Sequence, residues 1–539
     1  MAKGKGRRRA AIWVGAAMYA ILAALGVHEE LFGGIHPLLT PLAAVLAVPV
    51  CALGLSWFFS DGPRRLTVAA DAPAPRLQEK PFSIGRAFLV LLACYTPMFL
   101  CAYPGSFAYD VPFQLRQVFT GSYSTHHPLL HTLLLGGCVR LGQALGSINL
   151  GAALYTIIQM TALAGCFAAV CASLARRCGA RAARFAVLFF AVYPLHMFMA
   201  VNATKDVLFS GLFALTLALA TEELEQPESA RRGLYAGLIL CGAGMMLLRN
   251  NALYAVLVWL PLLALLLRRR ALRVIACLLA AVVLYAGANG AMKAATGAVD
   301  GDLAEMLSWP IQQLARARLH DEAALSGEEK AAIDALMPGE AWRKYDPTVS
   351  DPVKFEFDTE EFLRDPAYYA GIWLSVGKKC PVTYINAAVA LTSAFIHPYL
   401  SYGVSGYYLQ MGVSREQIDQ WCDFEWIEQT SPLRRVVDSL SWRFGAKGAM
   451  QIPGVGMLFN MGLIIWAMLF FVLRAWYDGR WAAFAAGLLP VLLWGTFLLG
   501  PVMAGRYVYP FVCCLPVLGM SNPKAFPCEG KVAARRADG

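Results

Sequence analysis

Charged residues are scarce in this sequence. Only 15% of its 539 residues are Asp, Glu, Lys or Arg, whereas an ordinary soluble protein contains about 25%. The hydrophobic residues, 58% of the chain, are gathered in blocks of about 17–25 residues, the length at which an α-helix crosses a bilayer. The composition therefore argues against a soluble multidomain enzyme and predicts an all-α, polytopic membrane protein.

The motifs of the common metal sites are also missing. None of the 14 cysteines belongs to a CxxC pair, and most lie inside apolar blocks, where cysteine behaves as a small hydrophobic residue. Cys380 and Cys422 lie in the largest polar segment, and a disulfide between them is left open. The histidines do not form the paired-histidine-plus-acid pattern of a zinc hydrolase.

The formal net charge of +10 does not indicate nucleic-acid binding, because the basic residues form short clusters between apolar blocks. This distribution is typical of membrane proteins, in which Lys and Arg mark the cytoplasmic loops. The first 30 residues resemble a signal peptide, but no small-residue cleavage site follows, so we interpret them as a retained anchor. The basic clusters lie at 3–9, 176–177, 231–232, 268–273 and in AARR near the C-terminus.

Twelve apolar segments are predicted to cross the membrane, with both termini in the cytoplasm. A further run, 128–145, is predicted to lie on the outer surface, because a span there would place Arg176 and later basic clusters outside. For the same reason we predict that the apolar run 381–400 is an interfacial or packed helix. The predicted spans are about 10–27, 38–59, 86–103, 148–175, 183–201, 206–221, 233–249, 251–268, 271–292, 455–474, 481–499 and 507–520.

This topology divides the chain into four parts. Most of the acids lie in the third part, which reads as a large, mainly helical extracytoplasmic segment. The parts are 1–84, with two spans and a cytoplasmic linker; 85–292, a transmembrane core with the outer loop 104–127; 293–450, the extracytoplasmic domain; and 451–539, with the last spans and a cytoplasmic tail.

The first outer loop carries one acid and a group of histidines, in the sequence SFAYDVPFQLRQVFTGSYSTHHPLLH. Asp110 is at such a position most often a turn former or helix cap, although a carboxylate there can also accept a proton from a hydroxyl or bind a metal ion. Pro128 marks a helix start behind His126 and His127. His127 and His131 share one helix face, which leaves metal binding open, but contact with a phosphate or sugar is favoured.

Basic residues also lie at the outer ends of predicted spans, where charge bias does not place them. Lys205 opens one span, Arg249 forms a turn between two, and Arg506 precedes the last. Because arginine binds phosphate bidentately and keeps its charge, these three residues together predict an extracytoplasmic anion site. Further candidates are Asp206, which also fits a helix N-cap, Gln313 and Arg316 in WPIQQLAR, and Tyr507 beside Arg506.

The order of these motifs resembles the GT-C superfamily of membrane glycosyltransferases, which includes the protein O-mannosyltransferases and the aminoarabinose transferases of lipid A. The resemblance covers roughly residues 85–320 and the last span. Tyr109 precedes Asp110 where several relatives carry a second acid, and the helix start reads His-His-Pro-Leu rather than His-Pro-Pro-Leu. The matching motifs are YPGSFAYDVPFQLRQ, HHPLLHTLL, KDVLFS, LLRNNALY, WPIQQLAR and AGRYVYP.

The resemblance implies a GT-C-like helical bundle that transfers a sugar from a polyprenyl-phosphate donor to an extracytoplasmic acceptor of the cell envelope. It implies that Asp110 is the catalytic base or orients the acceptor, with a divalent metal ion at Asp110 left open. It also implies that Lys205, Arg249 and Arg506 bind the donor phosphate. As further substrate contacts we expect His126, His127, Asp206, Gln313, Arg316 and Tyr507.

A transporter or flippase of a lipid-linked saccharide is the alternative function. Transporters usually place charges near the middle of the bilayer and often contain internal repeats. Here the charges lie at the outer edge, a large outer segment is present and no repeat is evident, which favours the enzyme. A membrane-bound assembly or polymer-ligating protein with no donor of its own is a third interpretation. The expected partners are the lipid-linked sugar and the plasma membrane.

Overall fold

The computed structural model describes residues 2–60, 81–108, 110–229, 232–397, 424–436 and 456–520, together with isolated positions between 418 and 454. Within these ranges the chain is helical and contains no β-strand, only four isolated β-bridges. The predicted all-α fold is confirmed for this part of the chain.

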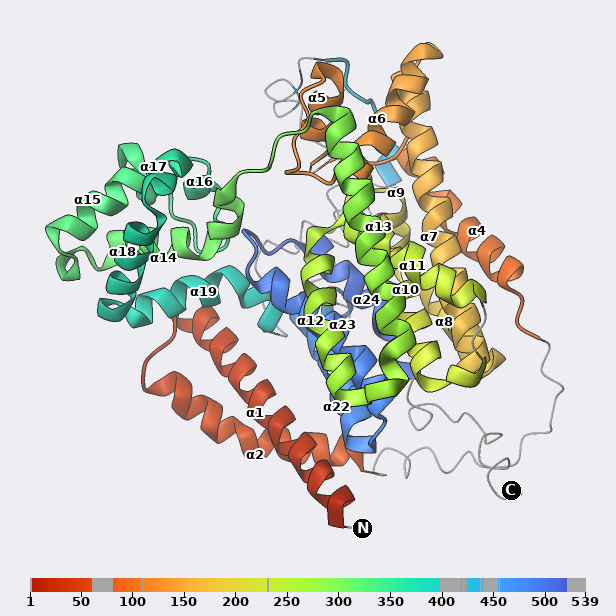
Figure 1. The fold of residues 1–539 in the computed structure, drawn as a ribbon, viewed down its shortest axis with the longest axis horizontal. Coiled ribbons are helices and arrows are strands. Elements are labelled where there is room, and N and C mark those ends of the chain that lie inside the picture. Colours follow the sequence, from red (N-terminus) through yellow and green to blue (C-terminus); the bar gives the residue numbers. More distant parts are fainter. Residues whose placement is uncertain are drawn as a thin grey trace.

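A helical bundle forms most of the molecule (Figure 1). Its central helix is α10 (Lys205–Glu225), which is buried along nearly its whole length against α7, α11, α23 and α24. A hairpin of two N-terminal helices leans against the bundle through α22. The helices are α1 (Ala2–Phe32), α2 (Leu39–Phe59), α4 (Ile84–Ala102), α7 (Ile148–Cys178), α8 (Ala180–Val192), α9 (Pro194–Val201), α11 (Arg232–Leu248), α12 (Asn250–Leu267), α13 (Leu272–Thr296), α22 (Met461–Asp478), α23 (Trp481–Leu498) and α24 (Tyr509–Met520).

Eight stretches of the described chain are long and apolar enough to cross a membrane, and the bent pair α8–α9 makes a ninth. The pair bends by 60° where Pro194 begins α9, since proline lacks the N–H that a continuous helix would use. The structure thus yields fewer spans by length and composition than the predicted twelve. The difference of three has two causes. The helices α11 and α24, which match two predicted spans, have only 17 and 12 residues, and α12 and α13, which match two more, are joined through η3 (Arg268–Ala271) and count as one stretch.

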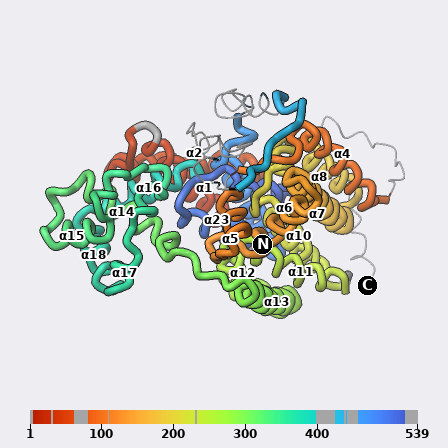
Figure 2. The backbone as a smooth tube through the Cα atoms, turned by 90° about the horizontal axis from the view of Figure 1, so that it is seen from above, coloured from red at the N-terminus to blue at the C-terminus, as the bar shows by residue number. Residues whose placement is uncertain are grey.

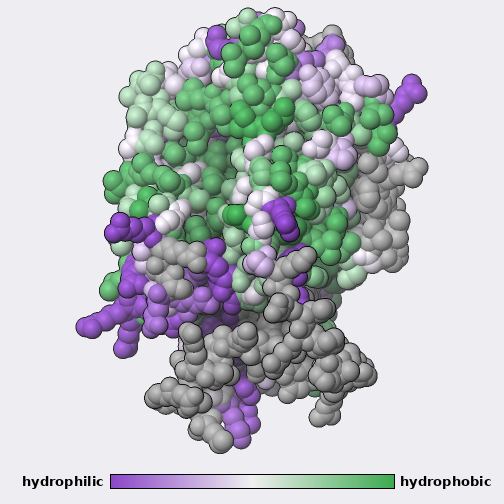
Figure 3. Space-filling model, turned by 90° about the vertical axis from the view of Figure 1, so that its right-hand side faces the viewer, coloured by the Kyte–Doolittle hydropathy of each residue, from purple (hydrophilic) through white to green (hydrophobic). Residues whose placement is uncertain are grey.

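Hydrophobic side chains cover much of the face that α4 and α8 form (Figure 3). Large side chains on it are strongly exposed, including Leu89 at 63%, Leu188 at 55% and Val192 at 56%. A soluble protein rarely leaves so broad an apolar surface in water, whereas lipid tails cover it at no cost. These helices therefore belong to a multi-pass membrane protein.

The predicted surface run 128–145 is the helix α6 (Leu129–Ala144), which packs along α7 and falls below the length of a membrane span. The two helices meet at Gly142 and Gly151, where a Cβ atom on either residue would collide with the backbone of the other helix. In front of α6 lies the short helix α5 (Val111–Thr120), whose carbonyl at Val118 accepts a hydrogen bond from Arg140.

Acids in the last turn of α10, at the end of the bundle opposite Lys205, pair with arginines of the basic clusters. Because arginines from 176–177 and from 268–273 meet at this one end, they lie on the same side of the bundle. The pairs are Glu222 with Arg176, Glu223 with Arg273, and Glu225 with both Arg177 and Arg480.

A second group of helices forms a lobe beside the bundle and has its own hydrophobic core (Figure 2). Its last helix, α19 (Pro381–Ile396), packs against α1, α14 and α22, in agreement with a packed helix in the run 381–400, whose end at 398–400 lies outside the described residues. Cys380 carries a free thiol, so the disulfide with Cys422 is not formed. The other lobe helices are α14 (Ser308–His320), α15 (Gly327–Leu336), α16 (Asp351–Lys354), α17 (Thr359–Arg364) and α18 (Pro366–Lys379).

Two connections bring the later part of the chain onto the loop between α4 and α5 and onto the segment that precedes α24. The stretch 424–436 crosses the loop, with Gln429 Nε2 donating to Gly105 O at 2.8 Å. From the lobe, Ser350 N donates to Pro501 O at 2.8 Å. Both contacts lie close in sequence to residues of the candidate site described next.

Candidate functional site

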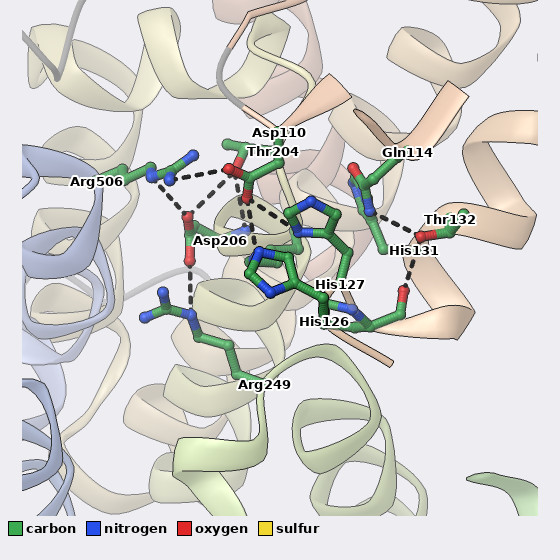
Figure 4. A network of polar contacts seen from close by, with 12 residues as sticks. Asp110, Gln114, His126, His127, His131, Thr132, Thr204, Asp206, Arg249 and Arg506 are labelled. Carbon is green, nitrogen blue, oxygen red and sulfur yellow. Dashed lines mark hydrogen bonds and ion pairs between the residues drawn. The ribbon is translucent and has the colours of Figure 1, made fainter. Parts of the chain in front are cut away.

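Five charged side chains from four separate parts of the chain meet at the end of the bundle where α10 begins (Figure 4). Each stands at the start of a helix. One lies directly before α5, two lie in the first turn of α10, one lies directly before α12, and one lies in the 3₁₀ turn η10 (Gly505–Val508) that leads into α24. The sequence predicted all five. We call them the ion-pair cluster: Asp110, Lys205, Asp206, Arg249 and Arg506.

Both carboxylate oxygens of Asp110 contact a cation. Lys205 Nζ lies 2.8 Å from Oδ2, and Arg506 Nη2 donates a hydrogen bond to Oδ1 at 3.2 Å. On the Oδ2 side, His127 Nδ1 follows at 3.9 Å. Asp110 occupies the N-cap position of α5, but its side chain makes no capping hydrogen bond. The carboxylate is therefore directed at the cluster and not at the helix backbone.

Asp206 is the more deeply buried acid, with 1% of its side chain exposed. Arg249 Nε lies 2.9 Å from Oδ1, Arg506 Nε lies 3.5 Å from Oδ2, and Thr204 Oγ1 donates to Oδ2 at 3.1 Å. The N-cap of α10 is Thr204 and not Asp206, the residue that the sequence suggested, because the Thr204 hydroxyl accepts the Asp206 N–H. Arg506 bridges the two acids and so joins the cluster into one network.

Aromatic rings surround Arg249. Its guanidinium carbon lies 4.3 Å from the ring centre of Tyr507 and 4.7 Å from that of Phe497. Such cation–π contacts stabilise a desolvated guanidinium and restrict its orientation. Arg506 also lies against Tyr507, at 5.3 Å. Tyr507, predicted as a substrate contact, thus supports both arginines of the cluster.

The surroundings lower the pKa of Asp110 and of His127. Burial alone would raise the pKa of the Asp110 carboxyl, but attraction by Arg506 and Lys205 outweighs it and holds the pKa well below the usual range. Burial lowers the pKa of His127 well below its usual value, and the positive charge of Lys205 acts in the same direction. At neutral pH the carboxylate is ionised and the imidazole is neutral.

His131 belongs to a buried hydrogen-bond network and not to a metal site. Its Nδ1 lies 3.1 Å from Gln114 Oε1 and its Nε2 lies 2.7 Å from Tyr155 OH. The network continues to Gln159, which donates to Asn202 O at 2.9 Å. Because both ring nitrogens of His131 are engaged with Gln114 and Tyr155, the suggested pairing of His127 with His131 around a metal is not formed. Burial lowers the pKa of His131 to about 3, so the ring is neutral. The network ties the α5–α6 region to the loop before α10.

A metal ion does not fit the residues around Asp110. Among the described residues, no group of three His, Cys, Asp or Glu side chains is arranged to hold one. The oxygens of Asp110 already contact Lys205 and Arg506, and a divalent cation between them would be repelled. We therefore derive no step through a metal ion.

The remaining predicted contacts lie further from the ion-pair cluster. His126 is 40% exposed, stacks edge-on against His127, and has its Nδ1 3.9 Å from Glu305 Oε1. Gln313 lies on α14 in the lobe, where it bonds Trp373 and the backbone of the last lobe helix. Arg316, on the same helix, donates to Tyr345 OH at 2.9 Å. The structure does not bring these two lobe residues to the cluster.

Sequence reasoning missed the neutral residues that support the cluster. Thr204 carries a signal that could have found it, because a threonine directly before Lys-Asp at a helix start is a common N-cap. Gln114, Tyr155 and Phe497 carry none, since each reaches its partner from a different helix through tertiary packing.

The comparisons with known proteins identify the family. The chain belongs to the family described as "Family of unknown function (DUF6020)", whose profile matches residues 119–529. No curated protein matches. Among solved structures, the chain is similar to ArnT from Cupriavidus metallidurans, a protein crystallised with bound undecaprenyl phosphate. The two chains share 13% identity over 81% of this chain and 78% of ArnT, with a TM-score of 0.29.

Proposed function

We propose that this protein is a GT-C-type membrane glycosyltransferase, which transfers a sugar from a polyprenyl-phosphate donor to an acceptor of the cell envelope. The observation that carries the proposal is the ion-pair cluster itself. Three cations and two acids, all nearly or largely buried, lie at helix ends and not in the middle of the bundle. A cluster with one excess positive charge beside a carboxylate suits a phosphate leaving group and a proton acceptor.

The proposed reaction is a direct displacement at the anomeric carbon. An oxygen of the acceptor hydroxyl forms the new bond to that carbon, and the bond between the carbon and the phosphate oxygen breaks. The bonding electron pair leaves with the polyprenyl phosphate. Asp110 accepts the proton of the hydroxyl, and Lys205 and Arg506 stabilise the charge that develops on the phosphate.

Charge balance supports this assignment. With His127 neutral, the ion-pair cluster carries a net charge of +1, and a sugar-phosphate diester with one negative charge neutralises it. After transfer the leaving phosphate bears a second negative charge, but Asp110 has then become neutral by accepting the proton. The site is therefore neutral both before and after the reaction, which keeps the cost of charge development low in a partly buried site.

We propose different roles for the three cations. Lys205 and Arg506 contact the more open acid, Asp110, so we propose that they bind the phosphate. Arg249 is held between aromatic rings and paired with the buried Asp206, so we assign it the positioning of that acid, and through it of Arg506. This differs from the initial expectation that all three bind phosphate directly.

His127 is proposed to orient the acceptor hydroxyl. Its Nδ1 is buried, faces Asp110 Oδ2 at 3.9 Å and has no hydrogen-bond partner in the described part of the chain. A hydroxyl placed between the two atoms would satisfy the ring nitrogen and deliver its proton to the carboxylate. The more exposed His126 would then contact the acceptor further from the reacting atom.

A turnover experiment separates this proposal from transport. Purified protein in liposomes should release polyprenyl phosphate from a radiolabelled polyprenyl-phosphate sugar when cell-envelope acceptors are supplied. A flippase would instead move the intact donor between leaflets. Translocation of uncleaved donor, with no release of polyprenyl phosphate from any donor and acceptor combination, would contradict the enzyme and favour the transporter.

We further propose that the ion-pair cluster faces the extracytoplasmic side of the plasma membrane and that both termini are cytoplasmic. The arginine-rich end of α10 supplies the support, since such clusters remain in the cytoplasm. In right-side-out vesicles, Ser122→Cys and Leu145→Cys should react with an impermeant maleimide, and Glu228→Cys only after permeabilisation. The protein without the added cysteine is the control. Labelling of Leu145→Cys only from inside would show that α6 spans.

A further inference from the structure

We propose that Asp110 occupies the place of the donor phosphate in the resting site, and that Lys205 and Arg506 exchange the carboxylate for the phosphate when the donor binds. This inference rests on the proposed function and adds an order to it. The donor binds first, and its binding releases the catalytic carboxylate for the acceptor.

The arrangement around Asp110 matches that of a phosphate. Two cations from different helices each contact a different oxygen of the carboxylate, Lys205 at Oδ2 and Arg506 at Oδ1. A phosphodiester presents two unsubstituted oxygens in a similar way, so the same two side chains can bind it without moving their backbones. The resting carboxylate and the donor therefore compete for one pair of cations.

The ion pairs differ in how deeply they are buried, and this difference indicates which of them can exchange a carboxylate for a phosphate. Asp110 is 20% exposed, and Lys205 reaches it through a flexible side chain that is 13% exposed. Asp206 is 1% exposed, and its partner Arg249 is fixed against Tyr507 and Phe497. The Asp206–Arg249 pair thus forms a fixed base, and Arg506, which contacts both acids, can leave Asp110 while Asp206 still holds it.

The exchange explains how a poor base becomes a useful one. While Arg506 and Lys205 contact Asp110, they outweigh the opposing effect of burial and keep its pKa well below the usual range, so the carboxylate has little tendency to accept a proton. Once the phosphate has taken the two cations, burial remains and favours the protonated form. Basicity would then increase only when a leaving group is present, which protects the donor-free enzyme from unproductive proton uptake.

The test measures binding of a polyprenyl phosphate without a sugar, so it requires no turnover. Equilibrium binding of radiolabelled polyprenyl phosphate in detergent is compared for the wild type, Asp110→Asn and Lys205→Met. Removing the competing charge should make Asp110→Asn bind at least ~10-fold more tightly, although the same variant transfers sugar far more slowly than the wild type. Lys205→Met should bind at least ~10-fold more weakly. Asp478→Asn, which alters a buried ion pair with Arg474 at the other end of the bundle, should not change the affinity.

Equal or weaker binding by Asp110→Asn would overturn the exchange, and it would leave the proposed function intact if the wild type still releases polyprenyl phosphate. Asp110→Ala provides a second variant if the asparagine variant does not fold. Failure of both variants to fold would show that the ion pairs of Asp110 are required for the structure. That result would also contradict the proposal that a phosphate takes the place of the Asp110 carboxylate. Conversely, tighter binding by Asp110→Asn with no turnover by the wild type would support a phosphate site and reject the transferase.

Discussion

Asp110→Asn is expected to lower the rate of sugar transfer by about 10³-fold, the middle of the range for loss of a general base. The asparagine keeps the size of the side chain and a carbonyl oxygen towards Lys205, but it cannot accept the proton of the acceptor. The rate of polyprenyl phosphate release in a single turnover with saturating donor is the relevant measurement. Under these conditions the tighter donor binding of the variant does not contribute to the rate.

Asp478→Asn is the matched control for this variant, because Asp478 also has a largely buried side chain in an ion pair, 2.9 Å from Arg474 Nε, but lies at the opposite end of the bundle. It should retain wild-type turnover. A transfer rate for Asp110→Asn within about threefold of the wild type would remove Asp110 from the reaction, since loss of a base costs at least ~100-fold.

Arg249→Met should produce the largest loss of stability among the cluster variants. Asp206 is 1% exposed, and without Arg249 its Oδ1 would retain no cationic contact. Removing one partner of a buried ion pair typically costs about 3–5 kcal/mol, because the other charge is left uncompensated. We expect a clear decrease in the temperature at which the detergent-solubilised protein aggregates, together with a lower yield of folded protein.

A double variant distinguishes charge from packing as the cause of this loss. Asp206→Asn combined with Arg249→Met removes both charges and keeps much of the volume, so it should regain most of the stability lost by Arg249→Met alone. If the double variant is as unstable as the single one, the stacking of Arg249 on Tyr507 and Phe497 carries the stability instead of the ion pair.

The charged part of the candidate site could be predicted because each residue breaks a pattern in its own segment. Lys205, Arg249 and Arg506 stand at the ends of apolar runs where charge bias does not place basic residues. Asp110 is the one acid in a short loop between such runs. Those local anomalies identified the residues, and the structure unites them in one network. Their catalytic roles stay predictions.

The partners of these residues could not be predicted, because they depend on distances between helices that are far apart in sequence. The helix-face argument placed His127 and His131 together as ligands, yet the ring of His131 turns to Gln114 and Tyr155. Gln313 and Arg316 resemble a substrate-binding face on their helix, yet they make contacts within the lobe and its neighbours. A helical period shows which residues share a face, but not what that face contacts.

The sequence alone determined that this chain is helical and membrane-embedded and that a few charged residues stand at the ends of its helices. Those features follow from hydrophobicity and charge bias, which act locally along the chain. Only the tertiary structure decided that Arg506 bridges Asp110 and Asp206 across 396 and 300 residues of sequence and that Arg249 is enclosed by rings from two other segments. Buried ion pairs require several cations and acids within a few ångströms, and only the packing of the helices sets those distances.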